Sequence, residues 1–202
     1  MPRGRTRDDN ARLRILDAAF ELVGGDGPGA VTINSIAAEA GVAKQTIYRW
    51  WPSRTAVVLD ALVHGTMRAT PFRRSDDIRG DFERHLAAVI KLFNSPTGAV
   101  IRELVADAQS DEDIADEFRA RFWGPRRDLS AARLRAGQEQ GTIRSDLDVE
   151  LVLDTVYGPL WLRLLIGHLP MRRTDAARIV DAVWPGIGAA HQDGARIAAA
   201  DD

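Results

Sequence analysis

The chain has 202 residues, of which 45% are hydrophobic, and a net charge of −2, so it can bury a sizeable core in one domain or in a small head joined to a larger body. Cysteine is absent, which excludes disulfides, thiolate nucleophiles and thiolate metal ligands. The chain has no apolar run near the roughly 20 residues of a membrane span and no apolar segment of a signal peptide, so we expect a soluble, cytoplasmic protein that does not contact membranes.

The first predicted helix starts near Asn10, where apolar residues recur at three- and four-residue intervals until Gly24 and Gly25. Basic residues are concentrated in this part of the chain, because residues 1–55 hold seven arginines and one lysine against six acidic residues, a balance of +2. Some of the arginines precede the helix, and others cluster near residue 49. Two basic clusters are consistent with two contacts to a nucleic-acid backbone, although ordinary solvated charge would give the same composition.

A helix, a glycine turn and a second helix are predicted between Thr32 and Trp50. Thr32 can cap the first of these helices, which runs to Ala40. Gly41 ends it, because glycine accepts the left-handed conformation at low cost. Residues 43–50 form the second helix. This is the helix-turn-helix geometry that places one helix in the major groove of DNA.

A connecting helix and longer helical stretches complete the prediction. Ser53 can cap the connecting helix, which runs to about Arg68. Pro125 and Pro159 fall inside two later stretches and should break or kink them. None of the later stretches alternates like a strand. They cover residues 78–94, 98–109, 114–141, 149–167 and 174–184.

The pattern indicates an all-α fold with two domains. We expect an N-terminal three-helix head in residues 1–55, joined by the connecting helix of about residues 53–68 to a larger C-terminal helical body in residues 69–190. The tail, residues 191–202, is rich in alanine and aspartate and is expected to be disordered.

The head carries a specific combination of residues. The combination lies in the segment RILDAAFELVGGDGPGAVTINSIAAEAGVAKQTIYRWWPSRTAVVLDAL. It consists of Ala37, Gly41, Val42, Lys44, Thr46, Tyr48, Pro52, Ser53 and Arg54. With these residues at these separations, about a quarter of the chain resembles the DNA-binding head of the TetR family of transcriptional regulators. The resemblance implies a homodimer that binds double-stranded, pseudo-palindromic operator DNA, most often as a repressor that a small-molecule effector releases. It also assigns the body to effector binding and dimerisation.

The resemblance implies roles for individual residues of the head. Gln45 and Thr46 lie near the start of the recognition helix, where the family contacts base edges; glutamine can bind adenine and threonine can touch a thymine methyl. Trp51 stands where the family has an aromatic core residue. Ala43 replaces the hydroxyl that many relatives have before this helix, so it cannot cap the helix with its side chain. The residues implied in contacts with the DNA backbone are Thr32, Lys44, Tyr48, Arg49, Arg54, Arg5 and Arg7.

Two sets of residues in the body are expected to have functions. In the family, the last two long helices pair with those of a second copy, and residues 149–167 are apolar nearly all round, more than one neighbour needs. The expected dimer interface consists of Val152, Val156, Leu160, Leu164, Ile179 and Val183. Flat aromatic side chains, which are also ordinary core residues, could line an effector pocket. They are Phe93, Phe122, Trp123, Tyr157 and Trp161.

Two other classes of protein are alternatives to this prediction. An enzyme would need a chemical motif, and the sequence contains no Gly-x-Ser-x-Gly elbow, His-Glu-x-x-His pair, phosphate-binding loop or dinucleotide fingerprint, so we expect neither catalysis nor a cofactor. His64, His85 and His168 lack a second ligand at a metal-binding spacing and are interpreted as ordinary helix or loop residues. An architectural DNA-binding protein would bind with little sequence preference and would need no cavity.

Overall fold

The computed structural model describes residues 3–25 and 31–189. In these ranges the chain forms helices and no strand, and Ile143 and Gly188 make an isolated β-bridge. The all-α fold class is therefore confirmed. No helix in the described part of the chain is long and apolar enough to cross a membrane. The expected tail, residues 191–202, lies outside the described residues. The elements are α1 (Arg3–Gly25), α2 (Ile33–Ala40), α3 (Lys44–Trp50), α4 (Arg54–Ala69), α5 (Ile78–Phe93), α6 (Pro96–Ala108), α7 (Glu112–Glu117), the π-helix η2 (Phe118–Trp123), α8 (Gly124–Glu139), α9 (Val149–Ile166) and α10 (Asp175–Ile187).

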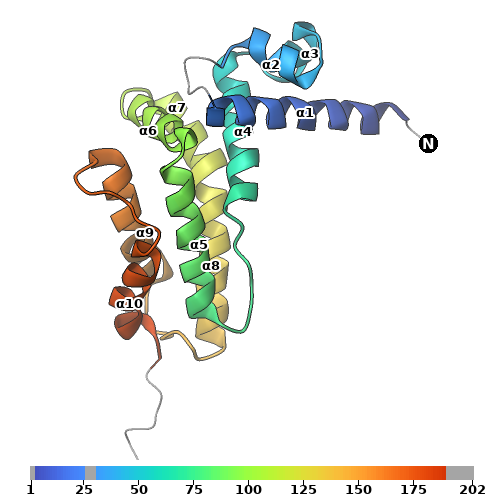
Figure 1. Ribbon diagram of the computed structural model, residues 1–202. Coiled ribbons are helices and arrows are strands. Elements are labelled where there is room, and N and C mark those ends of the chain that lie inside the picture. Colours follow the sequence, from blue (N-terminus) through green and yellow to red (C-terminus); the bar gives the residue numbers. More distant parts are fainter. Residues whose placement is uncertain (1–2, 26–30, 190–202) are drawn as a thin grey trace, which may run out of the picture.

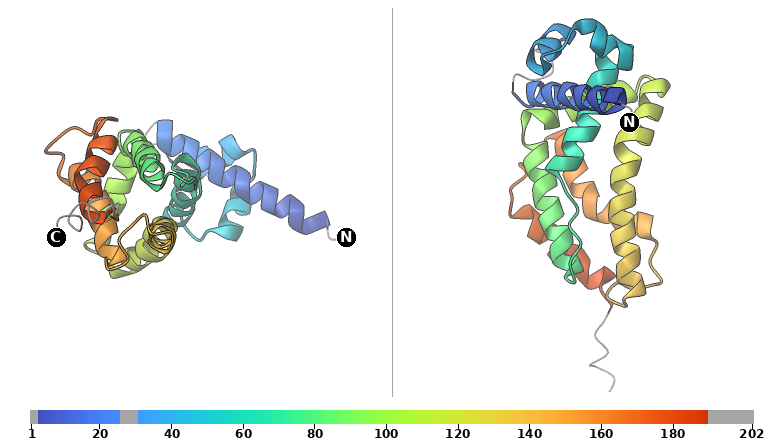
Figure 2. Two further views of the ribbon diagram at one scale, coloured as in Figure 1. Left: turned by 90° about the horizontal axis from the view of Figure 1, so that it is seen from below. Right: turned by 90° about the vertical axis from the view of Figure 1, so that its right-hand side faces the viewer.

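The helices form a small head at one end of an elongated body (Figure 1). Helices α1 to α3 make up the head, and α4 runs from the head into the body, where it lies near α5 and α8. Helices α9 and α10 cover the opposite side of the body. Seen along the body, α1 projects well beyond it (Figure 2). The head is therefore attached to the body mainly through α4 and the last turns of α1.

Local capping signals set the helix ends of the head as expected. The Thr32 hydroxyl accepts a hydrogen bond from the Ser35 backbone N–H at 3.0 Å, and the Ser35 hydroxyl accepts one from the Thr32 N–H at 2.9 Å, which makes a capping box. Gly41 ends α2 with a φ of 64°, in the left-handed region. The Ser53 hydroxyl accepts a hydrogen bond from the Ala56 N–H and so caps α4. The helix-turn-helix thus follows from its sequence residue by residue.

The start of α1 and the division of one long predicted stretch differ from the prediction for identifiable reasons. Helix α1 begins at Arg3 rather than Asn10, because the intervening segment contains several arginines, which favour helix, and no proline. The stretch predicted as residues 114–141 is divided into α7, η2 and α8. Pro125 has no N–H to donate, and the Gly124 N–H instead bonds to the carbonyl of Arg119 five residues back, which is π-helical geometry.

Prolines inside the last two helices do not end them. Helix α9 continues through Pro159 to Ile166, so the break allowed for in the prediction is absent. Helix α10 continues through Pro185 to Ile187, three residues beyond the predicted end. Both helices are packed against neighbours of the body, and this packing compensates for the backbone hydrogen bond that each proline removes.

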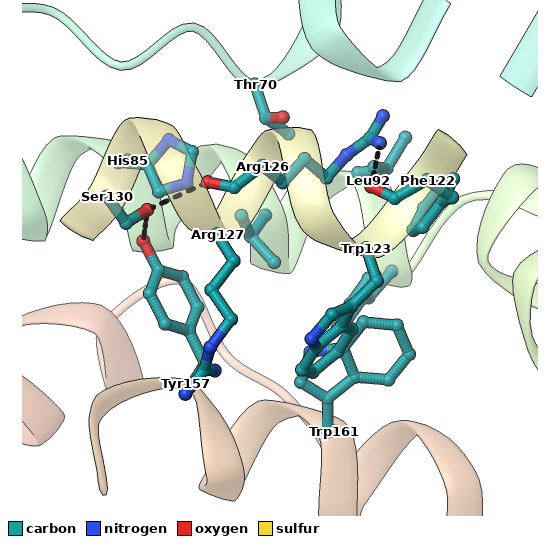
Figure 3. A pocket seen from close by; sticks show the side chains of 12 residues that line it. Thr70, His85, Leu92, Phe122, Trp123, Arg126, Arg127, Ser130, Tyr157 and Trp161 are labelled. Carbon is teal, nitrogen blue, oxygen red and sulfur yellow. Dashed lines mark hydrogen bonds between the residues drawn. The ribbon is translucent and has the colours of Figure 1, made fainter. Parts of the chain in front are cut away.

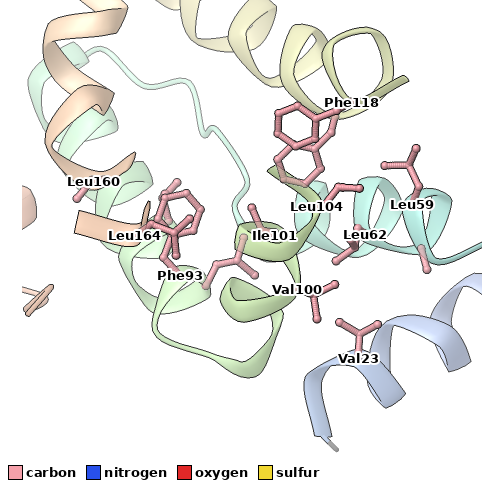
Figure 4. Packing of buried hydrophobic residues seen from close by; sticks show 14 of the residues in the cluster. Val23, Leu59, Leu62, Phe93, Val100, Ile101, Leu104, Phe118, Leu160 and Leu164 are labelled. Carbon is pink, nitrogen blue, oxygen red and sulfur yellow. The ribbon is translucent and has the colours of Figure 1, made fainter. Parts of the chain in front are cut away.

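The head packs on α4 through one close contact. A Cβ atom built on Gly65 would lie 2.2 Å from the ring of Phe20, so only glycine allows α1 to approach α4 this closely. Trp51, 3% exposed, packs in the core of the head, which confirms its expected role. The buried apolar side chains continue from the head into the body as one cluster, in which Val23 of α1 lies near Val100 of α6 (Figure 4).

A buried ion pair fixes the segment that follows α4. Asp81 of α5 and Arg133 of α8 are 2.8 Å apart and almost fully buried. Burial alone would raise the pKa of the Asp81 carboxyl, but hydrogen bonds from Ser75, Arg84 and Arg133 outweigh it and hold this pKa at about 2. The carboxylate therefore stays charged and keeps Ser75, in the connection between α4 and α5, against the body.

Replacing Gly65 by alanine should test the contact between α1 and α4. In a free helix this change stabilises by about 1 kcal/mol, whereas overpacking against Phe20 costs about 1–3 kcal/mol. We expect a net loss of stability, measured by urea unfolding. In a Phe20→Leu background the same change should become neutral or stabilising, because the smaller side chain leaves room for the methyl group. A stabilising effect in both backgrounds would show that the contact is not restrictive.

Candidate DNA-binding surface and effector cavity

Helix α3 presents a polar face to solvent and is anchored by one buried residue. Ile47 is fully buried, whereas Lys44, Gln45 and Tyr48 are exposed and Thr46 is half-buried. Residues three and four positions apart share a face of a helix, so the exposed side chains form one continuous surface. The Ala43 side chain makes no cap, as expected. The geometry leaves the proposed base readers and two proposed backbone contacts free to meet DNA.

The other residues proposed to contact the DNA backbone surround this helix. Thr32 is exposed at the start of α2, although its hydroxyl also takes part in the capping box. The Arg54 Nε–H donates to the backbone carbonyl of Val31, so this exposed side chain also fastens the start of α4. The Arg49 guanidinium lies 5.7 Å from the centre of the Trp50 ring, a cation–π contact.

The arginines at the start of the chain are arranged differently from the prediction. Arg5 and Arg7 are part of α1, so they do not form an arm that precedes the first helix. Their side chains lie outside what the structure describes. Their proposed contact with DNA would therefore have to come from the projecting end of α1 (Figure 2).

One carboxylate of α4 joins the head to the body. Asp60 accepts a hydrogen bond of 2.7 Å from the Trp51 indole N–H and one of 3.3 Å from Arg12 of α1. Arg121 of η2 makes an ion pair with the same carboxylate. A single side chain thus holds the end of the recognition motif, the first helix and a helix of the body. No sequence pattern indicates the role of this residue, because its partners are 9, 48 and 61 positions away.

A cavity of about 70 Å³ lies in the body, between the end of α4 and the helices α5, η2, α8 and α9 (Figure 3). All five aromatic residues expected to line a pocket are in its wall, in the company of seven others. The lining consists of Thr70, His85, Val89, Leu92, Phe93, Phe122, Trp123, Arg126, Arg127, Ser130, Tyr157 and Trp161. Three helices distant in sequence, α5, η2 and α9, therefore bring the predicted residues together.

The aromatic residues of the cavity contact one another mostly at an angle. The ring centres of Phe93 and Trp161 are 5.0 Å apart in an edge-to-face arrangement, and those of Trp123 and Trp161 are 5.2 Å apart and tilted. Such angled walls leave flat faces directed at the space between them. The cavity is suited to a flat, mostly apolar molecule.

Several polar residues of the cavity were missed at the sequence level. Burial lowers the pKa of Arg126 to about 10, and its guanidinium stacks 3.8 Å from the centre of the Phe122 ring. The hydroxyls of Ser130 and Tyr157 are 2.9 Å apart and satisfy each other, and burial raises the pKa of Tyr157. His85, 9% exposed, also lines the cavity, whereas the sequence predicts an ordinary helix or loop residue. Its place on the apolar face of α5, between buried residues at helical spacing, could have identified it.

A second cavity, of about 110 Å³, lies between α4 and α6 beside the head. Its wall includes the acidic side chains Glu103 and Asp107, together with Arg54, and no aromatic ring. The rest of its wall is mostly valine and leucine, so it offers no flat aromatic surface to a ring-shaped molecule.

The residues expected at the dimer interface face the wrong way. Val152, Val156, Leu160 and Leu164 are at most 5% exposed within the single chain, so this ridge of α9 packs inside the body and cannot also meet a second copy. Ile179 is buried in the same way, and Val183 is half-buried. The opposite face of the last helices is the exposed one. It carries Leu151, Gly158, Leu162, Leu165 and Ile166 of α9, and Ala182, Pro185 and Gly186 of α10.

Comparison with known proteins identifies the family. Residues 15–61 match the family model described as "Bacterial regulatory proteins, tetR family", and residues 73–183 match "Tetracyclin repressor-like, C-terminal domain". The transcriptional regulator YdeS of Bacillus subtilis is 38% identical over 93% of this chain and 94% of its own length. The DNA-binding transcriptional repressor TetR of Mycobacteroides abscessus is 25% identical over 90% and 93% of the two chains. The crystal structure of the TetR family transcription regulator SCO0332 is 34% identical, covers 87% of this chain and 97% of that one, and has a TM-score of 0.80. The chain therefore belongs to the TetR family of helix-turn-helix transcriptional regulators, and it is a DNA-binding regulator rather than an enzyme.

Proposed function

We propose that the protein is a cytoplasmic repressor that binds a pseudo-palindromic operator as a homodimer and leaves it when a small-molecule effector occupies the cavity. The observation that carries the proposal is the path of α4. This helix begins after a three-residue connection from α3 and ends at Ala69, and its C-cap residue, Thr70, lies in the cavity wall. A change in the cavity can thus move the attached head. The relative from Mycobacteroides abscessus, named a repressor, supports the direction of control.

The head, residues 1–55, is proposed to read DNA through α3. Gln45 and Thr46 would contact base edges, while Lys44, Tyr48 and Arg49 would hold phosphates on either side. Thr32 and Arg54, together with Arg5 and Arg7 from α1, would add further backbone contacts. Phosphate contacts set the position of the protein on DNA, and base contacts set the sequence that it prefers.

The body, residues 69–190, is proposed to pair with a second copy through the exposed faces of α9 and α10. Leu151, Leu162 and Ile166 are 65%, 54% and 67% exposed, which is a high exposure for large apolar side chains on one helix. The neighbouring surface of α10 has small residues, which allow a second helix to approach closely. A two-fold dimer would bury the same patch on both copies.

Induction is proposed to act through two links between the cavity wall and α4. Arg126, in the wall, donates to the backbone carbonyl of Val63 in α4 at 3.4 Å, and Arg121 of η2 pairs with Asp60. An effector that displaces η2 and α8 would therefore tilt α4 and its head. The two recognition helices must lie ~34–36 Å apart to enter successive major grooves, so a small tilt disfavours binding. A near-complete switch needs a preference of the effector for the tilted state of about 5 kcal/mol.

Replacing Gln45 by alanine should lower discrimination at particular base pairs by ~1–3 kcal/mol, because glutamine would no longer bind its base. Selection of binding sites from random DNA measures this. Tyr48→Phe is the matched control, since losing a phosphate contact should weaken all sequences alike. If wild type and Gln45→Ala selected motifs of equal strength, Gln45 would not be a base reader. If wild-type protein selected no motif at all, an architectural role would be favoured.

Replacing Leu162 by glutamate should dissociate the homodimer, because the charged side chain would be buried in the interface without a partner. Sedimentation at micromolar concentration measures the mass. Leu13→Glu, on the exposed face of α1, should leave the dimer intact. Val156→Glu should instead lower the unfolding temperature, since Val156 is part of the core of one chain. A dimeric Leu162→Glu variant, or a monomeric wild type, would contradict the proposed interface.

Replacing Arg121 by glutamine should weaken the coupling between effector and operator, because it removes one link from η2 to α4. We expect the coupling free energy between effector and operator to fall by about 0.5–2 kcal/mol. The affinity of the effector for the free protein should stay nearly unchanged. Fluorescence anisotropy of labelled operator, with and without an effector found by thermal-shift screening, measures it. Arg119→Gln is the control, because Arg119 pairs only with Glu112 and Asp116 in the described structure.

The same experiment has a reciprocal arm. Operator must weaken effector binding by the same factor by which effector weakens operator binding. Since the chain has no cysteine, one introduced at exposed Glu39 can carry a spin label on each head. Unchanged distances between the labels during release would exclude the tilt of the heads while leaving the regulator assignment intact.

A further inference from the structure

One atom in the cavity wall lacks a hydrogen-bond partner. This atom is Nδ1 of His85: it is buried, and no hydrogen-bond partner is found for it among the residues that the structure describes. Buried polar groups in proteins are nearly always paired, because an unpaired one loses its hydrogen bonds to water without replacement. The His85 ring also lines the cavity, so an occupant of the cavity is within its reach.

The surroundings of His85 define which partner it needs. The ring makes a hydrogen bond with the backbone carbonyl of Pro71, and a carbonyl only accepts, so a protonated ring nitrogen is the donor. Since Nδ1 is the atom without a partner, Nε2 carries this hydrogen. Burial lowers the pKa of His85 to about 4, although the bond to Pro71 partly opposes this effect, so the ring is neutral at pH 7. Nδ1 of a neutral ring protonated at Nε2 is a hydrogen-bond acceptor.

The neighbours of the His85 ring are aromatic and do not supply a donor. The Phe72 ring lies 4.6 Å from it and the Tyr157 ring 5.9 Å, centre to centre. The Tyr157 hydroxyl is already paired with Ser130. The His85 acceptor thus lies at the aromatic wall of the cavity, where the hydroxyl groups already have hydrogen-bond partners.

A buried cation limits the charge of an occupant. Arg126 bonds to the backbone carbonyls of Phe122 and Val63, and no carboxylate of the described residues pairs with it. A positively charged donor, such as an ammonium group, would be repelled in this low-dielectric space. A neutral donor with acidic character, such as a phenolic hydroxyl, would be tolerated.

We propose that the cavity binds a ring-containing effector with a neutral hydrogen-bond donor, a phenol-like hydroxyl or a ring N–H, and that His85 Nδ1 accepts this hydrogen. The aromatic walls hold the ring, and His85 selects for the donor. This inference rests on the proposed function, because it specifies the chemistry of the effector in the same cavity.

The size of the cavity suggests a suitable probe. Its volume of about 70 Å³ is smaller than that of an engineered cavity of about 150 Å³ that holds benzene. The cavity is partly open to solvent, so the walls need to enclose only one ring, with modest adjustment, and a short alkyl chain on that ring can lie in the opening. The probe is 4-propylphenol, and its control is 4-propyltoluene, in which a methyl group of similar size replaces the hydroxyl.

The first experiment uses the full-length wild-type protein. Because Trp123 and Trp161 line the cavity, quenching of tryptophan fluorescence reports binding of each probe. We expect 4-propylphenol to bind about tenfold more tightly than 4-propyltoluene, the effect of one buried hydrogen bond. Equal affinities, tighter binding of the toluene, or no binding of the phenol at millimolar concentration would each overturn the proposal.

The second experiment assigns the preference to His85. In His85→Phe, which keeps an aromatic ring but removes the acceptor, the ratio of the two affinities should fall to about one while 4-propyltoluene still binds. His168→Phe, at an exposed position, should keep the wild-type ratio. A full preference for the phenol in a folded His85→Phe variant would overturn the role of His85.

Operator binding separates this inference from the proposed function. A preference for 4-propylphenol that depends on His85, together with release of operator DNA, supports both. The same preference without any effect on operator affinity supports the chemistry of the cavity and refutes induction through it. Release of operator by both probes alike refutes the donor requirement while leaving induction in place.

Discussion

The arrangement of head and body depends on the carboxylate of Asp60. Its side chain is 13% exposed and is shared between the Trp51 indole, Arg12 and Arg121. A carboxylate withdrawn from water must have its hydrogen-bond and charge partners in place, so all three groups are held in fixed positions around α4. The recognition motif, the projecting first helix and η2 therefore cannot shift independently of α4. The contact of Phe20 with Gly65 fixes the same helix from the side of α1.

The π-helix η2 connects this junction with the cavity. It carries Arg121 toward Asp60, and the two residues that follow, Phe122 and Trp123, toward the cavity. Its last turn is widened next to Pro125, where a regular backbone hydrogen bond is missing. Short π-helical segments inside α-helices are frequent at functional sites. Helix η2 therefore both forms part of the cavity wall and is attached to α4.

The sequence predicted the head well because the signals there are local. Thr32, Gly41 and Ser53 determine helix ends through contacts with neighbours only a few residues away. The five aromatic residues of the cavity were predicted as a set, since large flat side chains on several helices tend to meet in the core. Asp60 and His85 were missed, because their importance comes from partners distant in sequence or from the lack of one. Periodicity reveals neither.

The error at the dimer interface has a different origin. Helix α9 is apolar on nearly all sides, so its pattern shows that two neighbours are needed but not which face each of them covers. The structure shows that the Val156 ridge is buried in the core of the single chain and that Leu162 is exposed, so the proposed dimer uses the Leu162 face. Tyr157 and Trp161, between these faces, line the cavity. On the proposed dimer, one helix thus separates the effector from the partner subunit by a single layer of side chains. If α9 pairs as proposed, its displacement would also disturb the dimer interface, so an effector would displace η2 more easily than α9. The dimer would then direct the response toward the head.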